Sequence, residues 1–169
     1  DLILDRDVTG DVERISPEAP IPVLAARNSD ERLGGAGNVV ANLRAMEAEV
    51  EVVGAVGPDR RGERLRAQLE NIGADVTGCA VDPTRPTIEK TRLISGATQM
   101  LRVDWEKKLP IEDALAERIL ADLPGRVARA RAVVLSDYGK GLLTRRLLAG
   151  AISAARSAGV PVLVDPKGQ

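Results

Sequence analysis

The sequence contains no histidine, a single cysteine and two aromatic residues, Trp105 and Tyr138, among its 169 residues. Without histidine, a Ser-His-Asp triad, a Cys-His nucleophile pair and histidine-ligated zinc are all excluded. Cys79 alone forms no intrachain disulfide, which favours a reducing compartment and predicts a cytoplasmic protein. No apolar run approaches 18 residues, and the opening residues Asp1 to Asp5 are not typical of a signal peptide.

Positive and negative charges are nearly equal in number, with 24 Lys and Arg against 25 Asp and Glu. The formal net charge of −1 argues against electrostatic binding to nucleic acid or to an acidic membrane surface. Hydrophobic residues make up 44% of the chain, which is enough for a sizeable core, and the length alone suggests one domain.

Four short apolar runs predict strands, and their near-continuous apolar character is typical of a parallel sheet that is buried on both faces. They occupy Leu2 to Leu4 and residues 50–56, 132–135 and 160–164. The alternative is that they are parts of buried helices. Four stripes at helical spacing alternate with them, at residues 39–46, 65–72 (ended by Gly73), 111–123 (before Pro124-Gly125) and 143–155 (ended by Gly159). This alternation indicates βαβ units, and hence an α/β fold.

Two polar segments interrupt the alternation, approximately residues 8–32 and 86–104. The first contains the proline-rich segment Ser16 to Pro20 and then a predicted strand at 22–27. The second reads as a hairpin that turns at Gly96-Ala97. We expect these strands to form a small subsidiary sheet over one edge of the α/β body, the alternative being ordinary surface loops.

Carboxylates follow the predicted core strands at Asp5, Asp59, Asp137 and Asp165. The carboxyl ends of parallel strands lie along one rim, which is where ligands of open α/β sheets bind. A row of carboxylates there suits sugar hydroxyls or Mg²⁺. Each aspartate has an alternative role as a helix cap or loop residue.

A glycine-rich turn, Leu33 to Val40, leads into a helix and presents free backbone N–H groups. Asn38 has two candidate roles, capping that helix or reaching a ligand. The turn is not a dinucleotide fingerprint because position 40 is valine, and the chain has no P-loop.

Two further loops, 136–141 and 165–168, combine aspartate, lysine and glycine. Lys140 and Lys167 suit phosphate contact, with solvated loops as the alternative.

On the predicted hairpin, Lys90 and Arg92 share one strand face, and Arg102 and Asp104 share a face of the next strand. Such a cluster suits a phosphorylated or polyhydroxylated ligand. Cross-strand ion pairing on a wet surface is the alternative.

Taken together, these motifs closely resemble the kinase domain of bacterial heptose-7-phosphate kinases, which belong to the ribokinase-like sugar kinases and are often fused to an adenylyltransferase. The matching segments are Leu4 to Arg6, Arg14 to Val23, Gly34 to Val39, Pro86 to Arg92, Leu101 to Asp104, Leu135 to Gly141 and Asp165 to Gly168.

The resemblance implies a three-layer α/β sandwich with a mostly parallel central sheet and a small β lid. It implies ATP- and Mg²⁺-dependent phosphorylation of the anomeric hydroxyl of heptose 7-phosphate, giving heptose 1,7-bisphosphate. That product leads to the ADP-heptose used in lipopolysaccharide. The resemblance also implies a homodimer that forms through the lid, and no nucleic-acid or membrane partner.

Carried over position by position, the resemblance assigns sugar or sugar-phosphate binding to Asp5, Gly35, Asn38, Lys90, Arg92, Arg102, Asp104 and Asp137. It assigns the nucleotide-phosphate side to Lys140, Asp165 and Lys167. Two positions depart from the family pattern: Asp7 stands where an aromatic is common, and Ala36-Gly37 where Ala-Ala is common.

The family's catalytic aspartate lies in a Gly-Ala-Gly-Asp motif, which does not occur here. We therefore expect residues 1–169 to be the N-terminal, sugar-binding part of the domain, with no turnover alone and with the catalytic aspartate beyond Gln169. Two alternatives remain open: a kinase of another sugar or sugar phosphate, and a non-catalytic module that binds sugar phosphates or forms dimers.

Overall fold

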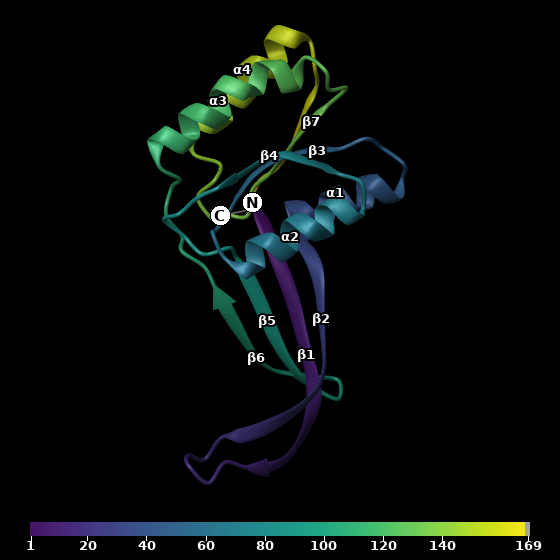
Figure 1. The fold of residues 1–169 in the computed structure, drawn as a ribbon, viewed down its shortest axis with the longest axis vertical. Helices are drawn as coiled ribbons and strands as arrows, with labels where there is room; N and C mark the ends of the chain where they lie inside the picture. The colour runs from purple at the N-terminus through teal and green to yellow at the C-terminus, as the bar shows by residue number, and fades with distance from the viewer. Residues whose placement is uncertain (168–169) are drawn as a thin grey trace.

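The computed structural model describes residues 1–167, which form eight strands and four helices (Figure 1). In chain order these are β1 (Leu2–Ile15), β2 (Pro22–Gly35), α1 (Ala36–Ala45), β3 (Glu51–Val56), α2 (Arg60–Asn71), β4 (Asp75–Val81), β5 (Glu89–Ser95), β6 (Thr98–Trp105), α3 (Asp113–Val127), β7 (Val133–Ser136), α4 (Arg145–Ala158) and β8 (Val162–Asp165).

The body has three layers, with strands between two pairs of helices (Figure 1). Strand β3 shows why, because its side chains alternate between two hydrophobic cores. Val52 and Val56 pack in the core that includes residues of α1 and α2. Val53 and Ala55 pack against the core formed by α3, α4 and β7. The predicted burial of this strand on both faces is confirmed.

Parallel pairing is also as predicted. β3 pairs with β4, β7 with β8, and β1 with β5, all in parallel register. Strand β4 has no counterpart among the predicted strands, because Asp75, Thr77 and Gly78 interrupt its apolar residues. Backbone pairing with β3, rather than an apolar sequence pattern, therefore defines β4 as a strand.

The helices follow the predicted apolar stripes with one difference. Leu65 and Leu69 of α2 are fully buried, and α4 ends at Gly159, whose positive φ of 67° suits glycine. Helix α3, however, begins at Asp113 and continues through Pro124 to Val127. The prediction that it ends before Pro124 is wrong, since Val127 extends the buried stripe by one more turn and is only 3% exposed.

The lid is a four-stranded sheet of order β2-β1-β5-β6, in which β1–β2 and β5–β6 are antiparallel. Strands β1 and β2 are much longer than predicted, whereas β5 and β6 lie close to the predicted hairpin strands at 87–95 and 99–104. β1 leaves the core after Leu4 and runs on to Ile15, and β2 runs from Pro22 to Gly35. Backbone pairing between the two strands, rather than apolar sequence, sets these lengths. The predicted turn at Gly96-Ala97 is confirmed between β5 and β6.

None of the helices within residues 1–167 is both long enough and apolar enough to cross a bilayer.

Candidate functional site

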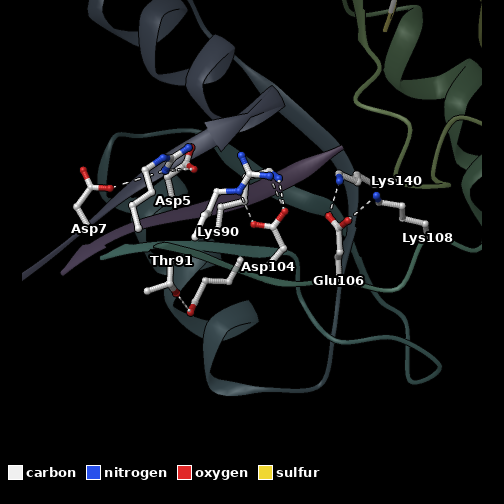
Figure 2. Close-up of polar contacts among 11 residues, drawn as sticks. Asp5, Asp7, Lys90, Thr91, Asp104, Glu106, Lys108 and Lys140 are labelled. Carbon is white, nitrogen blue, oxygen red and sulfur yellow. Dashed lines mark hydrogen bonds and ion pairs between the residues drawn. The ribbon is translucent and has the colours of Figure 1, made fainter. Parts of the chain in front are cut away.

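One face of the lid sheet carries charged side chains from β1, β5 and β6 at matching register positions, together with Arg32 and Asp30 of β2. The pairing aligns Asp5 with Lys90 and Lys90 with Asp104, and two residues further along it aligns Asp7 with Arg92 and Arg92 with Arg102. Because alternate residues of a strand share a face, all of these side chains lie on the same side of the sheet. Figure 2 labels four of them, Asp5, Asp7, Lys90 and Asp104, which gather over the lid strands.

These side chains form ion pairs across the strands. Arg92 Nη1 donates to Asp5 Oδ1 at 2.7 Å, and Lys90 Nζ donates to Asp104 Oδ2 at 3.2 Å. Arg102 donates to both oxygens of Asp104, at 2.7 and 3.0 Å. The Arg102 guanidinium, together with Lys90, lowers the pKa of Asp104 below its ordinary value although burial opposes this. Cross-strand ion pairing, one of the two predicted roles, is therefore present.

Asp7 has a buried carboxylate oxygen that accepts no hydrogen bond from the described residues. Its Oδ2 lies 2.6 Å from Arg32 Nη2, whereas its Oδ1 is buried and accepts no hydrogen bond within residues 1–167. The nearest cation to Oδ1 is Arg92, at 3.7 Å. A buried acceptor without a donor is unfavourable, so a turn of the Asp7 side chain that lets a ligand hydroxyl donate to this oxygen would be favourable.

The opposite face of the lid is closed by α2. Glu89 is 2% exposed and accepts from Arg61 Nε at 3.1 Å and from Thr91 Oγ1 at 2.7 Å. Arg61 also lies over the Trp105 ring, 4.5 Å from its centroid. In Figure 2, Thr91 points away from Lys90 and Asp104, toward this closed side. The face that carries Asp5 is therefore the one open to a ligand.

The glycine turn brings Gly34 next to Asp5, and Gly35 and Asn38 follow it in the chain. A Cβ at Gly34 would lie 2.1 Å from Asp5 Oδ2, so the turn is in direct contact with that carboxylate. Gly35 has a φ of 55° and precedes α1, which has no side-chain cap. The capping role for Asn38 is therefore wrong. Asn38 is an exposed residue of the first turn of α1, beside uncapped backbone N–H groups.

Asp137 and Asp165 lie side by side at the ends of β7 and β8, as predicted. The Asp137 N–H donates to the Asp165 carbonyl at 2.9 Å, and Gly139 N–H donates to Asp137 Oδ1 at 2.8 Å. Lys167 passes over Gly139, where a Cβ would lie 2.9 Å from Lys167 Cδ. The backbones of the two aspartates thus meet at this rim, and the Lys167 side chain lies beside the same loop.

The other two aspartates that follow predicted core strands have different settings. Asp5 is inside β1 rather than at the end of a strand. Asp59 caps α2, accepting from Gly62 N–H at 2.9 Å and from Thr87 N–H at 3.0 Å. Burial opposes ionisation of Asp59, but these hydrogen bonds hold its pKa below the ordinary value. For Asp59 the alternative role as a helix cap is the correct one.

Lys140 is 6% exposed, and its ammonium group pairs with Glu106, just beyond the end of β6 (Figure 2). Glu106 also pairs with Lys108 at 2.9 Å. Burial disfavours the charged carboxylate, but the hydrogen bonds from Lys140 and Lys108 lower the pKa of Glu106. Lys140 therefore connects the loop after β7 to the lid.

Three residues that contact this loop have no signal in the sequence analysis. The Asp1 carboxylate accepts hydrogen bonds from Tyr138 N–H and Lys140 N–H, both at 3.0 Å. Arg85, held by the buried Asp82 at 2.6 Å, donates to the Lys140 carbonyl at 3.3 Å. Glu106 is the third. Their partners are 34 to 139 residues away in the chain, so no local spacing identifies them.

Within residues 1–167, no three Asp, Glu or Cys side chains are grouped to hold a metal ion. Mg²⁺ in kinase sites is commonly held by one or two carboxylates together with substrate phosphates and water. Asp137 and Asp165, whose backbones meet at the ends of β7 and β8, are the candidate carboxylates for such a site.

Comparison with known proteins gives a single family over the whole chain. Residues 1–169 match the family described as pfkB family carbohydrate kinase. The protein called "Bifunctional protein HldE" of Bradyrhizobium sp. (strain ORS 278) is 46% identical over 169 residues, covering 99% of this chain and 34% of that protein. Its namesake in Caulobacter vibrioides is 48% identical over 167 residues, with the same coverage. The chain thus spans about a third of the length of these curated relatives.

Solved structures support the fold. Arabidopsis thaliana ribokinase complexed with ribose and ATP superposes with a TM-score of 0.67 at 18% identity, covering 99% of this chain and 52% of that one. Phosphofructokinase-2 from Escherichia coli, in complex with fructose-6-phosphate, gives 0.66 at 19% identity, with 99% and 53% coverage. These likenesses confirm the predicted ribokinase-like α/β fold.

Proposed function

This chain belongs to the pfkB family of carbohydrate kinases, and on that premise we propose that it forms the sugar-binding part of an ATP-dependent heptose-7-phosphate kinase. The proposed reaction phosphorylates the anomeric hydroxyl and yields heptose 1,7-bisphosphate. The heptose assignment rests on the resemblance of the sequence motifs, and similarity to the proteins called HldE supports it.

The observation that carries the proposal is the charged face of the lid, which offers hydroxyl acceptors and phosphate-binding cations together. Asp5 and Asp7 lie side by side on β1, with side chains only 18% and 15% exposed. Both suit hydrogen-bond donation from sugar hydroxyls. Lys90, Arg92 and Arg102 lie within the same face and suit a phosphate group.

The present ion pairs do not exclude a phosphorylated ligand. Arg102 is 47% exposed, and its bond to Asp104 is of the kind that contributes little in water. A phosphate that replaces a carboxylate as the partner of Arg102 and Lys90 keeps both cations paired. We propose that Arg102, Lys90 and Asp104 together recognise the 7-phosphate end, and that Gly35, Asn38 and Asp5 recognise the hydroxyls near the reacting carbon.

The chemistry is a displacement at phosphorus. The anomeric hydroxyl oxygen forms a bond to the γ-phosphorus of ATP, the bond from that phosphorus to its bridging oxygen breaks, and ADP leaves. The hydroxyl proton passes to a base, which the resemblance assigns to the aspartate of the family's Gly-Ala-Gly-Asp motif, a motif that residues 1–169 do not contain. The residues of this chain contribute orientation, on which phosphoryl transfer largely depends.

The rim at the ends of β7 and β8 is the proposed nucleotide-phosphate side. Asp137 and Asp165 would hold a phosphate-bound Mg²⁺, and Lys167 would contact the phosphates. When bound, Mg²⁺ neutralises charge that develops on the transferring group. Lys140 borders this rim through its loop, although its ammonium group pairs with Glu106. With ATP as the donor, we place the enzyme in the cytoplasm.

We also propose a homodimer that forms through the lid. Apolar side chains on the lid strands support it, since Ile15 and Leu101 are 61% and 56% exposed and Met100 is 42% exposed. The molar mass of the full-length protein in solution, measured by light scattering, tests this assignment.

The test of the proposed activity is a substrate panel with the full-length protein that carries this chain, Mg²⁺ and ATP. We expect product formation with heptose 7-phosphate at a kcat/KM at least about tenfold above that for hexose phosphates and unphosphorylated sugars. ³¹P NMR of the product identifies the phosphorylated carbon. A preference for another sugar phosphate would refute the heptose assignment, and the absence of phosphotransfer would favour a binding module. Residues 1–169 alone are expected to show no turnover.

A further inference from the structure

The loop after β7 surrounds a carboxylate that belongs to the chain itself. Asp1 is 5% exposed, and its Oδ2 accepts from Tyr138 N–H and Lys140 N–H at 3.0 Å each. Its Oδ1 accepts from Leu142 N–H at 3.3 Å. Three alternate backbone N–H groups thus converge on a single side chain.

The backbone of the loop explains this convergence. Gly139 and Gly141 have positive φ values of 63° and 98°, whereas none of the residues between and beside them has a positive φ. Alternation of backbone handedness turns successive N–H groups toward one side and makes a concavity that binds anions. In this protein the anion that fills the concavity is the Asp1 carboxylate.

The same loop has little backbone left for a phosphate. Gly139 N–H donates to Asp137 Oδ1, and Asp137 N–H donates to the Asp165 carbonyl. Any phosphate contact from this loop must therefore come mainly from side chains. The glycines give the loop its shape around Asp1 rather than a cradle for a nucleotide.

We propose that Asp1 is a positioning residue, an internal anion that fixes the loop from Asp137 to Leu142 and thereby places Asp137 and Lys140. Two other contacts assist it, from Glu106 to the Lys140 ammonium group and from Arg85 to the Lys140 carbonyl. The catalytic consequence rests on the proposed function, whereas the anion-filled concavity does not.

Hydrogen exchange tests the concavity without reference to activity. In the full-length protein, the amides of Tyr138, Lys140 and Leu142 are expected to exchange slowly. In Asp1→Ala they are expected to exchange roughly tenfold faster or more, because each loses a hydrogen bond to a charged acceptor. Sodium formate, a small carboxylate, is expected to restore their protection, whereas sodium chloride at equal ionic strength is not.

A matched control is Asp75→Ala, which removes a carboxylate that accepts one backbone hydrogen bond, from Thr77 at 2.8 Å, at the start of β4. This variant should leave exchange at 138–142 unchanged, with or without formate. Asp1→Asn provides a variant of the same size, because its amide group would point N–H toward backbone N–H groups. If Asp1→Ala does not fold, hydrogen exchange and the kinetics described next are measured on Asp1→Asn instead.

Kinetics test the positioning role. Asp1→Ala is expected to lower kcat by about tenfold to a hundredfold, the range for a catalytic group displaced by roughly 1 Å, while the KM for ATP changes little. Formate should restore part of kcat in Asp1→Ala but have no effect on Asp75→Ala. A purely structural role would instead lower the melting temperature and leave the kinetics of the folded enzyme unaltered.

Three results would overturn the proposal: unchanged exchange at 138–142 in Asp1→Ala, faster exchange that formate does not reverse, or faster exchange with normal kcat. If the wild-type protein has no sugar kinase activity, the proposed function fails, and the exchange experiment still decides whether Asp1 holds the loop.

Discussion

The sharpest test of the sugar site is Gly34→Ala, a change of one methyl group at a residue that itself offers no functional atom. The new Cβ would lie 2.1 Å from Asp5 Oδ2 and 2.9 Å from its Cγ, whereas ordinary contact begins at 3.4 Å. The Asp5 carboxylate must therefore move by about 1 Å, which is enough to lower kcat/KM by as much as roughly a hundredfold. Because the atom displaced is the end of a side chain, the fold itself can remain.

The cost to stability should be small. Moving the Asp5 carboxylate weakens its 2.7 Å pair with Arg92, whose side chain is 25% exposed. Partly exposed pairs of this kind contribute about 1 kcal/mol or less. A matched control is Gly125→Ala in α3, where a Cβ would meet nothing within 4 Å. That variant should gain about 0.5–1 kcal/mol of stability with unchanged activity.

The assay compares kcat/KM for heptose 7-phosphate among Gly34→Ala, Asp5→Asn and the double variant of the full-length enzyme, with thermal denaturation in parallel. If the methyl group acts through Asp5, the double variant should lose little more than Asp5→Asn alone. Additive losses, or normal activity in Gly34→Ala, would refute the contact as the cause.

Three further predictions concern single carboxylates. Glu106→Gln should remove an acid-sensitive contribution to stability: the pKa of Glu106 is lowered from 4.5, so its pair with Lys140 stabilises the fold above about pH 4.5 and is lost as pH falls through the lowered value. Thermal denaturation at pH 7 and pH 4 should therefore show a smaller acid loss in the variant. Asp59→Ala removes the cap of α2 and the acceptor for Thr87 N–H, and should cost about 1–2 kcal/mol, measured by denaturant unfolding. Asp7→Asn should raise the KM for the sugar phosphate by about tenfold if the free Oδ1 accepts a substrate hydroxyl, the amide being free to turn its N–H₂ toward the ligand.

Contrary outcomes are specific to each variant. Equal acid loss in wild type and Glu106→Gln would mean that this pair does not govern acid stability. Unchanged unfolding of Asp59→Ala would show that water replaces both acceptor bonds. An unaltered KM in Asp7→Asn would place the substrate away from that oxygen.

Much of the body could be predicted from the sequence because the buried faces of its helices and strands require apolar residues at regular spacing. The stripe through Leu65 and Leu69 and the two-sided apolar run in β3 both result from burial, and burial selects residue types. The lid strands are less apparent in the sequence, since β6 is exposed along its whole length and its pairing with β5 places it where no apolar periodicity does.

The candidate site divides in the same way. Lys90 and Arg92 could be predicted to share a face because strand alternation is local. The role of Asp1 could not be predicted, since its partners lie 137 to 141 residues away and are backbone groups, which every residue possesses. Asp59 shows that a local pattern can also mislead, because an aspartate shortly after a strand predicts a ligand site but caps a helix there.

The inner and outer halves of the 14-residue strand β1 differ in how well they should tolerate substitutions and insertions. Its register with β2 shifts between Thr9 and Gly10 and again between Val12 and Arg14. Asp5 and Asp7 precede these irregularities, lie in regular pairing with β2, and closely follow the buried Leu4. The part of β1 beyond Gly10, with its partner in β2, projects from the body as a two-stranded arm (Figure 1). Insertions or substitutions in the outer arm can therefore accumulate without moving the carboxylates, while a single-residue slip in the inner half would turn both of them to the face closed by α2.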